Sequence, residues 1–166
     1  MHVLNVHERR FRCSPSRAAS LLDSLASPHD LLWPSKHWPR MWLDKPLGTG
    51  ATGGHGPIRY SVVAHEPGKR VTFKFISPRG FVGEHWFEIL CDEKLQTTLR
   101  HTIDMTLVGS ALFAWPLAIR PLHDALIEDA LTNAQVALGE EPTAVAWSPW
   151  VRVLRNVVGR RSKRAR

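Results

Sequence analysis

The sequence is poor in cysteine and lacks a long apolar run. Its two cysteines, Cys13 and Cys91, are too few for a disulfide framework and lack the clustered spacing of a zinc site. The longest uncharged stretch, residues 105–119, is interrupted by Pro116 and is shorter than the roughly 20 residues of a membrane helix. No basic segment followed by an apolar run opens the chain, so we expect a cytoplasmic protein without a signal peptide.

Acidic residues are absent from residues 142–166, which hold seven basic residues. These seven account for the whole net charge of +7, so residues 1–141 are neutral. A neutral body makes nucleic acid an unlikely partner, and the high isoelectric point describes only the tail. We therefore expect a folded domain over residues 1–141 and a basic amphipathic tail over residues 142–166.

Strand patterns dominate the first two thirds of the chain. Short turns separate several of the segments, which predicts antiparallel pairing. The predicted strands cover residues 2–13, 41–47, 58–65, 70–76, 81–90 and 95–107. Ser-Pro pairs at residues 14–15 and 27–28 predict two short helices after the first strand. The order indicates an α+β domain with its helices on one face of a sheet of six or seven strands.

A long helix is predicted to end near Leu138, followed by Gly139, with Pro121 starting or kinking it. Its apolar stripe at three- and four-residue steps consists of Ile119, Leu122, Leu126, Ala130, Ala134 and Ala137. The polar residues Arg120, Asp124, Glu128 and Gln135 are predicted to lie mostly on other faces, with Asp124 and Glu128 in solvent. The small alanines favour close packing on the sheet, so open volume is expected nearer Ile119 and Leu126.

Three short segments carry a family resemblance. Residues 56–60 (GPIRY), 83–88 (GEHWFE) and 99–103 (LRHTI), together with the order of elements, resemble the polyketide cyclase/dehydrase-like branch of the START/Bet v 1-like (SRPBCC) superfamily. The likeness covers roughly residues 2–138. It implies a helix-grip fold, in which a curved antiparallel sheet wraps around a long C-terminal helix and encloses an apolar cavity. It implies binding of lipids, polyketides or other hydrophobic molecules, with a minority of enzymes and no universal catalytic residue.

Two histidines are predicted to point into this cavity. Alternation along the strands puts His85 and His101 on the apolar faces of their strands, where they are candidate anchors for a ligand or a general acid/base. Each could equally be a satisfied core histidine. No third ligand accompanies them, so neither a metal nor a cofactor is predicted. The candidate ligand-binding residues are Trp38, Trp42, Tyr60, Phe73, Phe75, His85, Phe87, Leu99, His101, Ile103, Met105, Ile119, Leu122 and Leu126.

Two segments before residue 60 have alternative interpretations. Residues 48–53 match GxGxxG, but another predicted strand follows instead of a helix, so we predict a flexible hairpin loop and not a nucleotide site. Residues 33–42 hold three tryptophans, of which Trp38 and Trp42 are predicted at a cavity entrance. Plain core packing of these indoles is the alternative.

The basic tail suggests a function of its own. Ser148 and Pro149 predict the start of a basic amphipathic helix, which suits an anionic membrane surface, a cationic arm for nucleic acid or docking on a protein partner. The candidate contact residues are Trp150, Arg152, Arg155, Arg160 and Arg161. A frayed terminus is the alternative.

Three functions remain in competition at this point. The favoured one is binding, transport or sequestration of a small hydrophobic or lipid-like molecule, because no defensible acid–base pair is visible. The second is a cyclase/dehydratase-like enzyme that uses a cavity histidine. The third is a peripheral membrane or interaction protein that acts through its tail.

Overall fold

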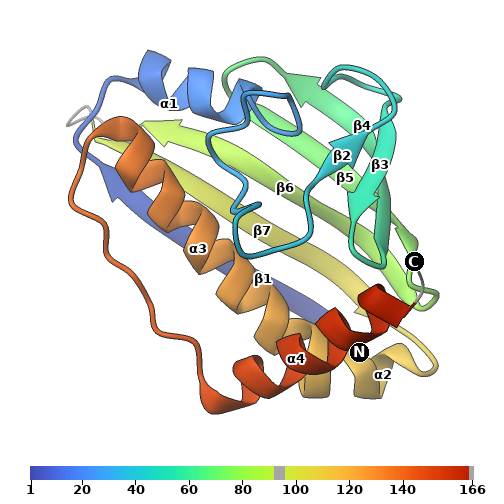
Figure 1. Cartoon of the computed structure of the whole chain (residues 1–166). Helices are drawn as coiled ribbons and strands as arrows, with labels where there is room; N and C mark the ends of the chain where they lie inside the picture. Colours follow the sequence, from blue (N-terminus) through green and yellow to red (C-terminus); the bar gives the residue numbers. More distant parts are fainter. Residues whose placement is uncertain (92–95, 165–166) are drawn as a thin grey trace.

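A curved antiparallel sheet of seven strands forms the body of the protein, in the order β1-β7-β6-β5-β4-β3-β2 (Figure 1). The computed structural model describes residues 1–91 and 96–164, with side chains up to Val157. The strands are β1 (His2–Phe11), β2 (Trp42–Leu43), β3 (Thr52–His55), β4 (Ile58–Glu66), β5 (Arg70–Ser77), β6 (Phe81–Cys91) and β7 (Thr97–Leu107). The predicted turn at residues 91–94 lies almost entirely outside the described residues.

One short helix, α1 (Pro15–Asp23), follows β1. The second helix predicted near residues 29–32 is wrong. The Asp30 carboxylate accepts hydrogen bonds from the backbone N–H groups of Leu32 and Trp33 at 2.9 and 2.8 Å, so this segment forms side-chain-capped turns. Among the described helices, none has the length and apolar character that a bilayer span requires.

The long helix begins earlier than predicted and is continuous from α2 (Ala111–Ala114) through a π-helical turn, η1 (Trp115–Ile119), into α3 (Arg120–Leu138). The Arg120 N–H donates to the Trp115 carbonyl, which is the wider hydrogen bond of a π turn. Pro121 lies in the first turn of α3, directly after the π-helical turn, so it does not start the continuous helix. It has no N–H for the carbonyl of Leu117 four residues earlier, and the Trp150 indole donates to that carbonyl at 2.8 Å instead. Trp150 lies in the last helix, α4 (Pro149–Arg164).

Part of the glycine-rich segment, Thr52–His55, forms a strand. The strand predicted over residues 41–47 shrinks to β2, while the predicted loop contains β3, which pairs with both β2 and β4. Glycine is required there because the strands approach closely. A Cβ on Gly53 would lie 1.9 Å from the Trp42 carbonyl oxygen, and one on Gly54 would lie 2.0 Å from the Ile58 carbonyl oxygen.

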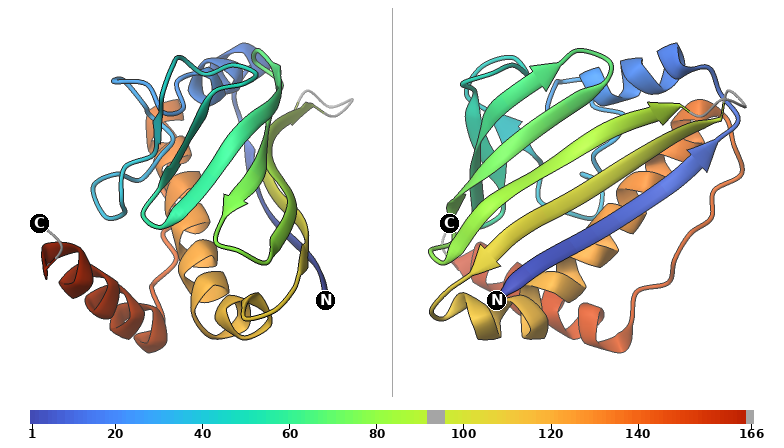
Figure 2. Two further views of the ribbon diagram at one scale, coloured as in Figure 1. Left: turned by 90° about the vertical axis from the view of Figure 1, so that its right-hand side faces the viewer. Right: turned by 180° about the vertical axis from the view of Figure 1, so that it is seen from behind.

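The sheet curves around α3, and its other face is left uncovered by helices (Figure 2). The core has two parts. The larger cluster surrounds α1 and the second half of α3, where Ala130 and Ala134 are fully buried. The smaller cluster lies at the other end of the sheet, around Phe81 and Trp115. Ala137 is exposed, contrary to the predicted stripe, and Leu138 takes the buried position four residues after Ala134.

A substitution tests the close approach at β3. We expect Gly54→Ala to lower the free energy of unfolding by about 1–3 kcal/mol, because its Cβ meets backbone that has no room to move. Gly48→Ala is the matched control, since its nearest heavy atom would be the Pro46 oxygen at 3.8 Å. Urea unfolding of both variants measures the effect. Equal stability of the two would contradict the described pairing of β3 with β4.

Candidate functional site

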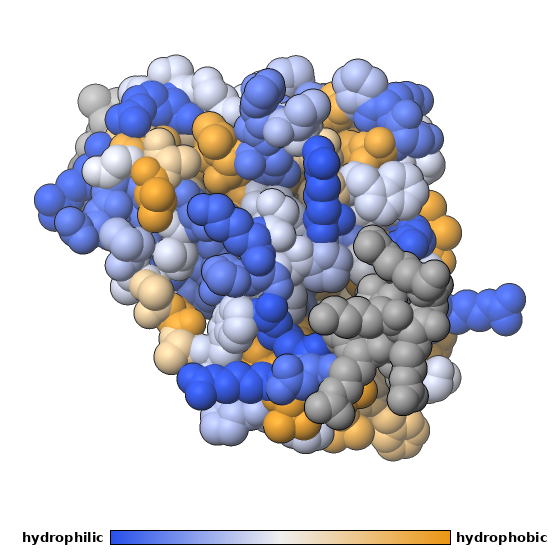
Figure 3. Space-filling view, in the orientation of Figure 1, coloured by the Kyte–Doolittle hydropathy of each residue, from blue (hydrophilic) through white to orange (hydrophobic). Residues whose placement is uncertain are grey.

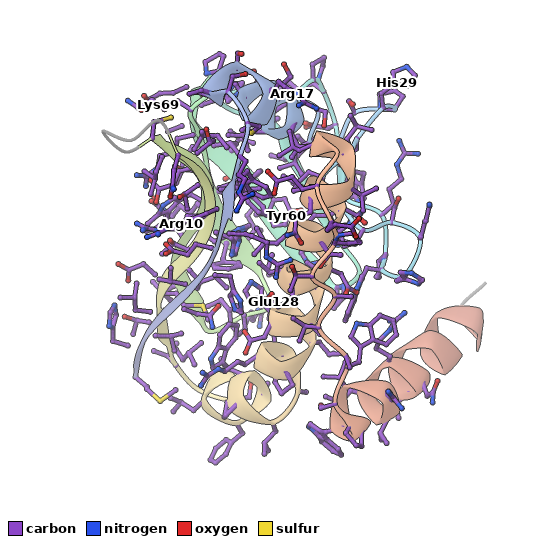
Figure 4. All side chains as sticks on the ribbon, turned by 90° about the vertical axis from the view of Figure 1, so that its left-hand side faces the viewer. Arg10, Arg17, His29, Tyr60, Lys69 and Glu128 are labelled. Carbon is purple, nitrogen blue, oxygen red and sulfur yellow. The ribbon has the colours of Figure 1, made fainter. Side chains whose placement is uncertain are left out.

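A cavity of about 500 Å³ lies between the two parts of the core, bounded by the sheet, the long helix and residues 33–41. This volume is within the usual range for small-molecule sites. It is lined by Trp33, His37, Trp38, Pro39, Met41, His55, Gly56, Pro57, Ile58, Tyr60, Phe75, Phe81, His85, Phe87, His101, Ile103, Trp115, Ile119, Leu122, His123, Leu126, Ile127 and Arg155. Tyr60 lies deep between the sheet and α3, whereas Arg10 lies on the outer side of the sheet (Figure 4).

Most of the predicted ligand-binding residues line this cavity. They are Trp38, Tyr60, Phe75, His85, Phe87, His101, Ile103, Ile119, Leu122 and Leu126. The cavity occupies only the end of the helix near Ile119 and Leu126, so predicted residues that lie elsewhere on the sheet do not reach it.

Four predicted residues lie elsewhere. Leu99 and Phe73 are buried in the larger core cluster, and the Phe73 ring stacks behind His85 at 5.0 Å. Met105 belongs to the smaller cluster. Trp42 is 46% exposed on the edge strand β2, with the Arg59 guanidinium 5.6 Å from its ring. Alternation along a strand gives the face of each side chain but not its position along the groove.

His85 and His101 contact each other inside the cavity. The Nδ1 of His85 and the Nε2 of His101 are 3.3 Å apart, so one ring donates to the other. The remaining ring nitrogens, His85 Nε2 and His101 Nδ1, are buried without a hydrogen-bond partner. Burial, together with the neighbouring imidazoles, holds the pKa of each well below its usual value, so both rings are neutral.

Sequence reasoning missed three further histidines of the cavity wall, His37, His55 and His123. His55 is on β3, for which the sequence predicts a loop because of its glycines. The Nδ1 of His55 lies 3.2 Å from the Tyr60 hydroxyl. Burial lowers the pKa of His55 to about 3 and raises the pKa of Tyr60. His123 sits beside Leu122 on α3. The spacing of Ile119, His123 and Leu126 was the available signal that it faces inward.

A cluster that we call the mouth lies on the side of the cavity where Arg155 of α4 lines the wall, and it consists of Trp38, Trp147, Asp129 and Arg155. Asp129 on α3 accepts hydrogen bonds from the indoles of Trp38 and Trp147 at 2.7 and 3.1 Å. The Arg155 guanidinium lies 4.5 and 3.6 Å from the centroids of these two rings. It also donates to the His37 carbonyl, while its Nη1 is buried without a partner. Burial lowers the pKa of Arg155.

The tail residues predicted for membrane or partner contact have different surroundings. Arg155 is at the cavity mouth, and Trp150 donates to the long helix while remaining 51% exposed. Arg152 is exposed on α4. The side chains of Arg160 and Arg161 lie outside the described part of the chain.

A polar seam joins β1 to α3 on the far side of the cavity. It corrects the prediction that Asp124 and Glu128 lie in solvent. The inward side chains of β1 meet them, with His7 Nε2 at 3.1 Å from Asp124 Oδ1 and His7 Nδ1 at 2.8 Å from Glu128 Oε1. Arg9 binds Glu128 at 2.7 Å. Two further residues of α3 accept hydrogen bonds from Arg9, Thr132 at 3.2 Å and the buried Gln135 at 2.8 Å.

The seam shifts the pKa values of its members. Burial lowers the pKa of His7, but hydrogen bonds to Asp124 and Glu128 outweigh it, so the pKa is raised. Burial raises the pKa of Asp124, but hydrogen bonds with His123 and His7 outweigh it, so the pKa is held well below its usual value. The ligand atoms of His7, His123 and Asp124 all lie within 4.8 Å of one another.

No protein-family model matches the chain, and no curated protein matches it. Solved structures do. The chain has the helix-grip fold of Bet v 1-like (SRPBCC) proteins, which confirms the predicted architecture.

Three solved structures illustrate the likeness. Truncated norcoclaurine synthase from Thalictrum flavum has a TM-score of 0.61 at 14% identity, over 85% of this chain and 96% of that one. CalU16 from Micromonospora echinospora has a TM-score of 0.56 at 14% identity, over 95% and 84%. The di-domain ARO/CYC protein StfQ of the steffimycin biosynthetic pathway has a TM-score of 0.59 at 15% identity. That match covers 81% of this chain and 50% of StfQ. At these identities the likeness establishes the fold alone.

The buried neutral histidines predict a loss of stability in acid. In the unfolded chain, His55 and His85 have an ordinary pKa near 6.5, whereas in the fold both values are far lower. The unfolded state therefore binds more protons below pH 6.5. The free energy of unfolding then falls from pH 6.5 toward pH 3, by up to about 1.4 kcal/mol per pH unit for each histidine.

Chemical unfolding at pH 7 and pH 5 tests this expectation. His85→Phe should show a shallower loss than the wild type, by about 1 kcal/mol per pH unit. His29→Ala, in an exposed turn, is the control and should keep the wild-type slope. An unchanged slope in His85→Phe would rule out a neutral buried imidazole at this position.

Proposed function

We propose that this protein binds a small hydrophobic, lipid-like molecule in the cavity between the sheet and α3, for transport or sequestration. The observation that carries the proposal is an apolar cavity of about 500 Å³ whose wall contains imidazole nitrogens without partners. An unpaired buried polar group costs about 1–3 kcal/mol, which a suitable ligand would recover. The proposed ligand has an apolar body that packs on the aromatic wall and a polar group that reaches His85 or His101.

The second candidate is a cyclase/dehydratase-like enzyme with His85 or His101 as general acid/base. The contact between the two rings supports it, as does likeness of fold to an ARO/CYC protein and to norcoclaurine synthase. Binding is favoured because none of the described residues lining the cavity is a carboxylate. The acid–base groups of the wall are then neutral imidazoles and the Tyr60 hydroxyl, whose pKa burial raises.

Filling the cavity tests the first candidate. Native mass spectrometry should show an apolar molecule bound to wild-type protein. Leu122→Trp should reduce that molecule and weaken binding of anilinonaphthalene sulfonate at least about tenfold, because the indole takes the ligand's space. Val136→Trp is the control, because Val136 lies on the same helix and is 61% exposed.

The outcome separates the candidates. No bound molecule, together with equal probe binding by the two tryptophan variants, would exclude a ligand cavity. The alternative outcome is that wild type and His101→Phe carry molecules of different mass. If the wild type also converts the molecule recovered from the variant into its own, the protein is an enzyme and not a carrier.

The third candidate, contact with an anionic membrane, has support at one end of the molecule. In the orientation of Figure 1 the surface is mostly hydrophilic, with apolar residues in several small groups, one of them at the lower edge (Figure 3). Phe113, Leu117 and Trp150 are 72%, 62% and 51% exposed, and they lie near the end of the molecule where η1 contacts α4. Such a surface beside a basic helix is suited to a lipid headgroup region.

Substitution of two arginines on α4 tests whether this helix borders the cavity or contacts a membrane. Arg155→Ala removes the guanidinium at the mouth, so we expect bound anilinonaphthalene sulfonate to dissociate several-fold faster. Arg152→Ala, in an exposed position of the same helix, should leave that rate unchanged. Binding to phosphatidylserine vesicles at low salt is measured in parallel. Equal losses of vesicle binding with unchanged dissociation would assign α4 to the membrane instead of the cavity.

A further inference from the structure

We propose that His7, His123 and Asp124 form a binding site for a divalent transition-metal ion, with zinc as the best match. The site lies in the polar seam, on the side of His123 that faces away from the cavity. Asp124 Oδ1 is 3.1 Å from His7 Nε2 and 3.4 Å from His123 Nδ1. In a tetrahedral zinc site with bonds of about 2.0–2.1 Å, neighbouring ligand atoms lie about 3.3 Å apart. The two separations to Asp124 are therefore close to those that an ion would impose, and the ligand atoms of His7 and His123 lie within 4.8 Å of each other.

A hydrogen bond at one ring nitrogen of His7 orients the other toward the proposed ion. Its Nδ1 lies 2.8 Å from Glu128 Oε1, and Arg9 holds the other oxygen of Glu128 at 2.7 Å. A carboxylate behind a coordinating imidazole fixes the ring and its tautomer, as at many metal sites in proteins. Without an ion, the Nε2 of His7 hydrogen-bonds Asp124 Oδ1 at 3.1 Å. A metal ion would displace the proton from this nitrogen, while Nδ1–H stays donated to Glu128.

Asn5 supplies an independent observation. Its Nδ2 is 3.1 Å from Asp124 Oδ1, while its Oδ1 is buried without a hydrogen-bond partner. The oxygen and nitrogen of an amide occupy nearly identical positions, and a half-turn exchanges them. After that exchange Oδ1 faces the same centre as the other ligand atoms, and a cation there satisfies it. Asn5 is thus the proposed fourth ligand.

The charge of the site suits one ion with monodentate Asp124. Glu128 is neutralised by Arg9, and Arg120 lies 3.5 Å from the second oxygen, Asp124 Oδ2. Arg120 is 59% exposed, so it holds Oδ2 from the solvent side and does not occupy the centre. Two imidazoles and one carboxylate are a donor set that zinc accepts readily.

The ion would also act on the cavity. Coordination through Nδ1 leaves the Nε2 of His123 protonated, and this atom is buried without a partner in a residue of the cavity wall. The His123 ring lies 5.1 Å from His101 and 5.9 Å from Trp115. A bound metal therefore fixes His123 as a hydrogen-bond donor toward a cavity ligand. This last step rests on the proposed cavity function, whereas metal binding itself does not.

Calorimetric titration of metal-free, untagged full-length protein with zinc chloride tests the site, without any cavity ligand. We expect one zinc ion per chain. Asp124→Asn and His7→Ala should each weaken binding at least about 100-fold, and Glu128→Gln about 10–100-fold. His2→Ala is the control, since His2 forms a separate exposed pair with Asp104 at 2.7 Å. No binding, or binding unchanged by Asp124→Asn and His7→Ala, overturns the proposal.

A measurement on the wild type tests the site even if the variants fail to fold. In nitrogen-detected NMR of the histidine side chains, one equivalent of zinc should shift the resonances of His7 and His123 and leave those of His2 and His29 in place. Shifts confined to the other histidines overturn the site. Repeating the anilinonaphthalene sulfonate titration with and without zinc tests the coupling separately. Zinc binding with unchanged probe affinity rejects the coupling to the cavity and keeps the metal site.

Discussion

The polar seam between β1 and α3 is the interaction on which the rest of the structure depends. The inward face of β1 carries Asn5, His7 and Arg9, which cannot pack against an apolar helix face without losing their hydrogen bonds. They meet Asp124 and Glu128 instead, across more than a hundred residues of chain. These contacts fix α3 at one edge of the sheet and set its rotation. Leu122 and Leu126 then face the middle strands, where the cavity lies.

The size of the side chains along α3 decides where that space opens. Ala130 and Ala134 are fully buried in the larger core cluster, so the second half of the helix lies close to the sheet. Toward Ile119 the side chains are longer, yet they leave the cavity between the helix and the sheet unfilled. The space is lined by neutral imidazoles. Burying their ring nitrogens without hydrogen-bond partners lowers the stability of the fold. A dry apolar core would be more stable and would offer a ligand no orientation.

The sequence predicts the layers and the inward faces well, because period-two alternation and helical spacing depend only on local positions. His85, His101 and Ile103 were placed inward on this ground alone. It predicts the seam poorly. His7 and Glu128 are 121 positions apart, so nothing local marks them as partners, and an acidic pair on a helix is more typical of a solvent face. β3 was missed because glycine in a strand reflects close backbone approach and gives no propensity signal.

The helix α3 serves three sites with residues only a few positions apart. Asp124 and Glu128 face the seam, Leu122 and Leu126 face the cavity, and His123 contacts both. Asp129 holds the indoles of Trp38 and Trp147, between which the Arg155 side chain packs at the mouth. A rotation of the helix of even one residue, about 100°, would break all three arrangements together. The seam, the cavity wall and the mouth therefore constrain one another. A change at the seam that turns α3 alters the shape of the cavity without touching any residue of its wall.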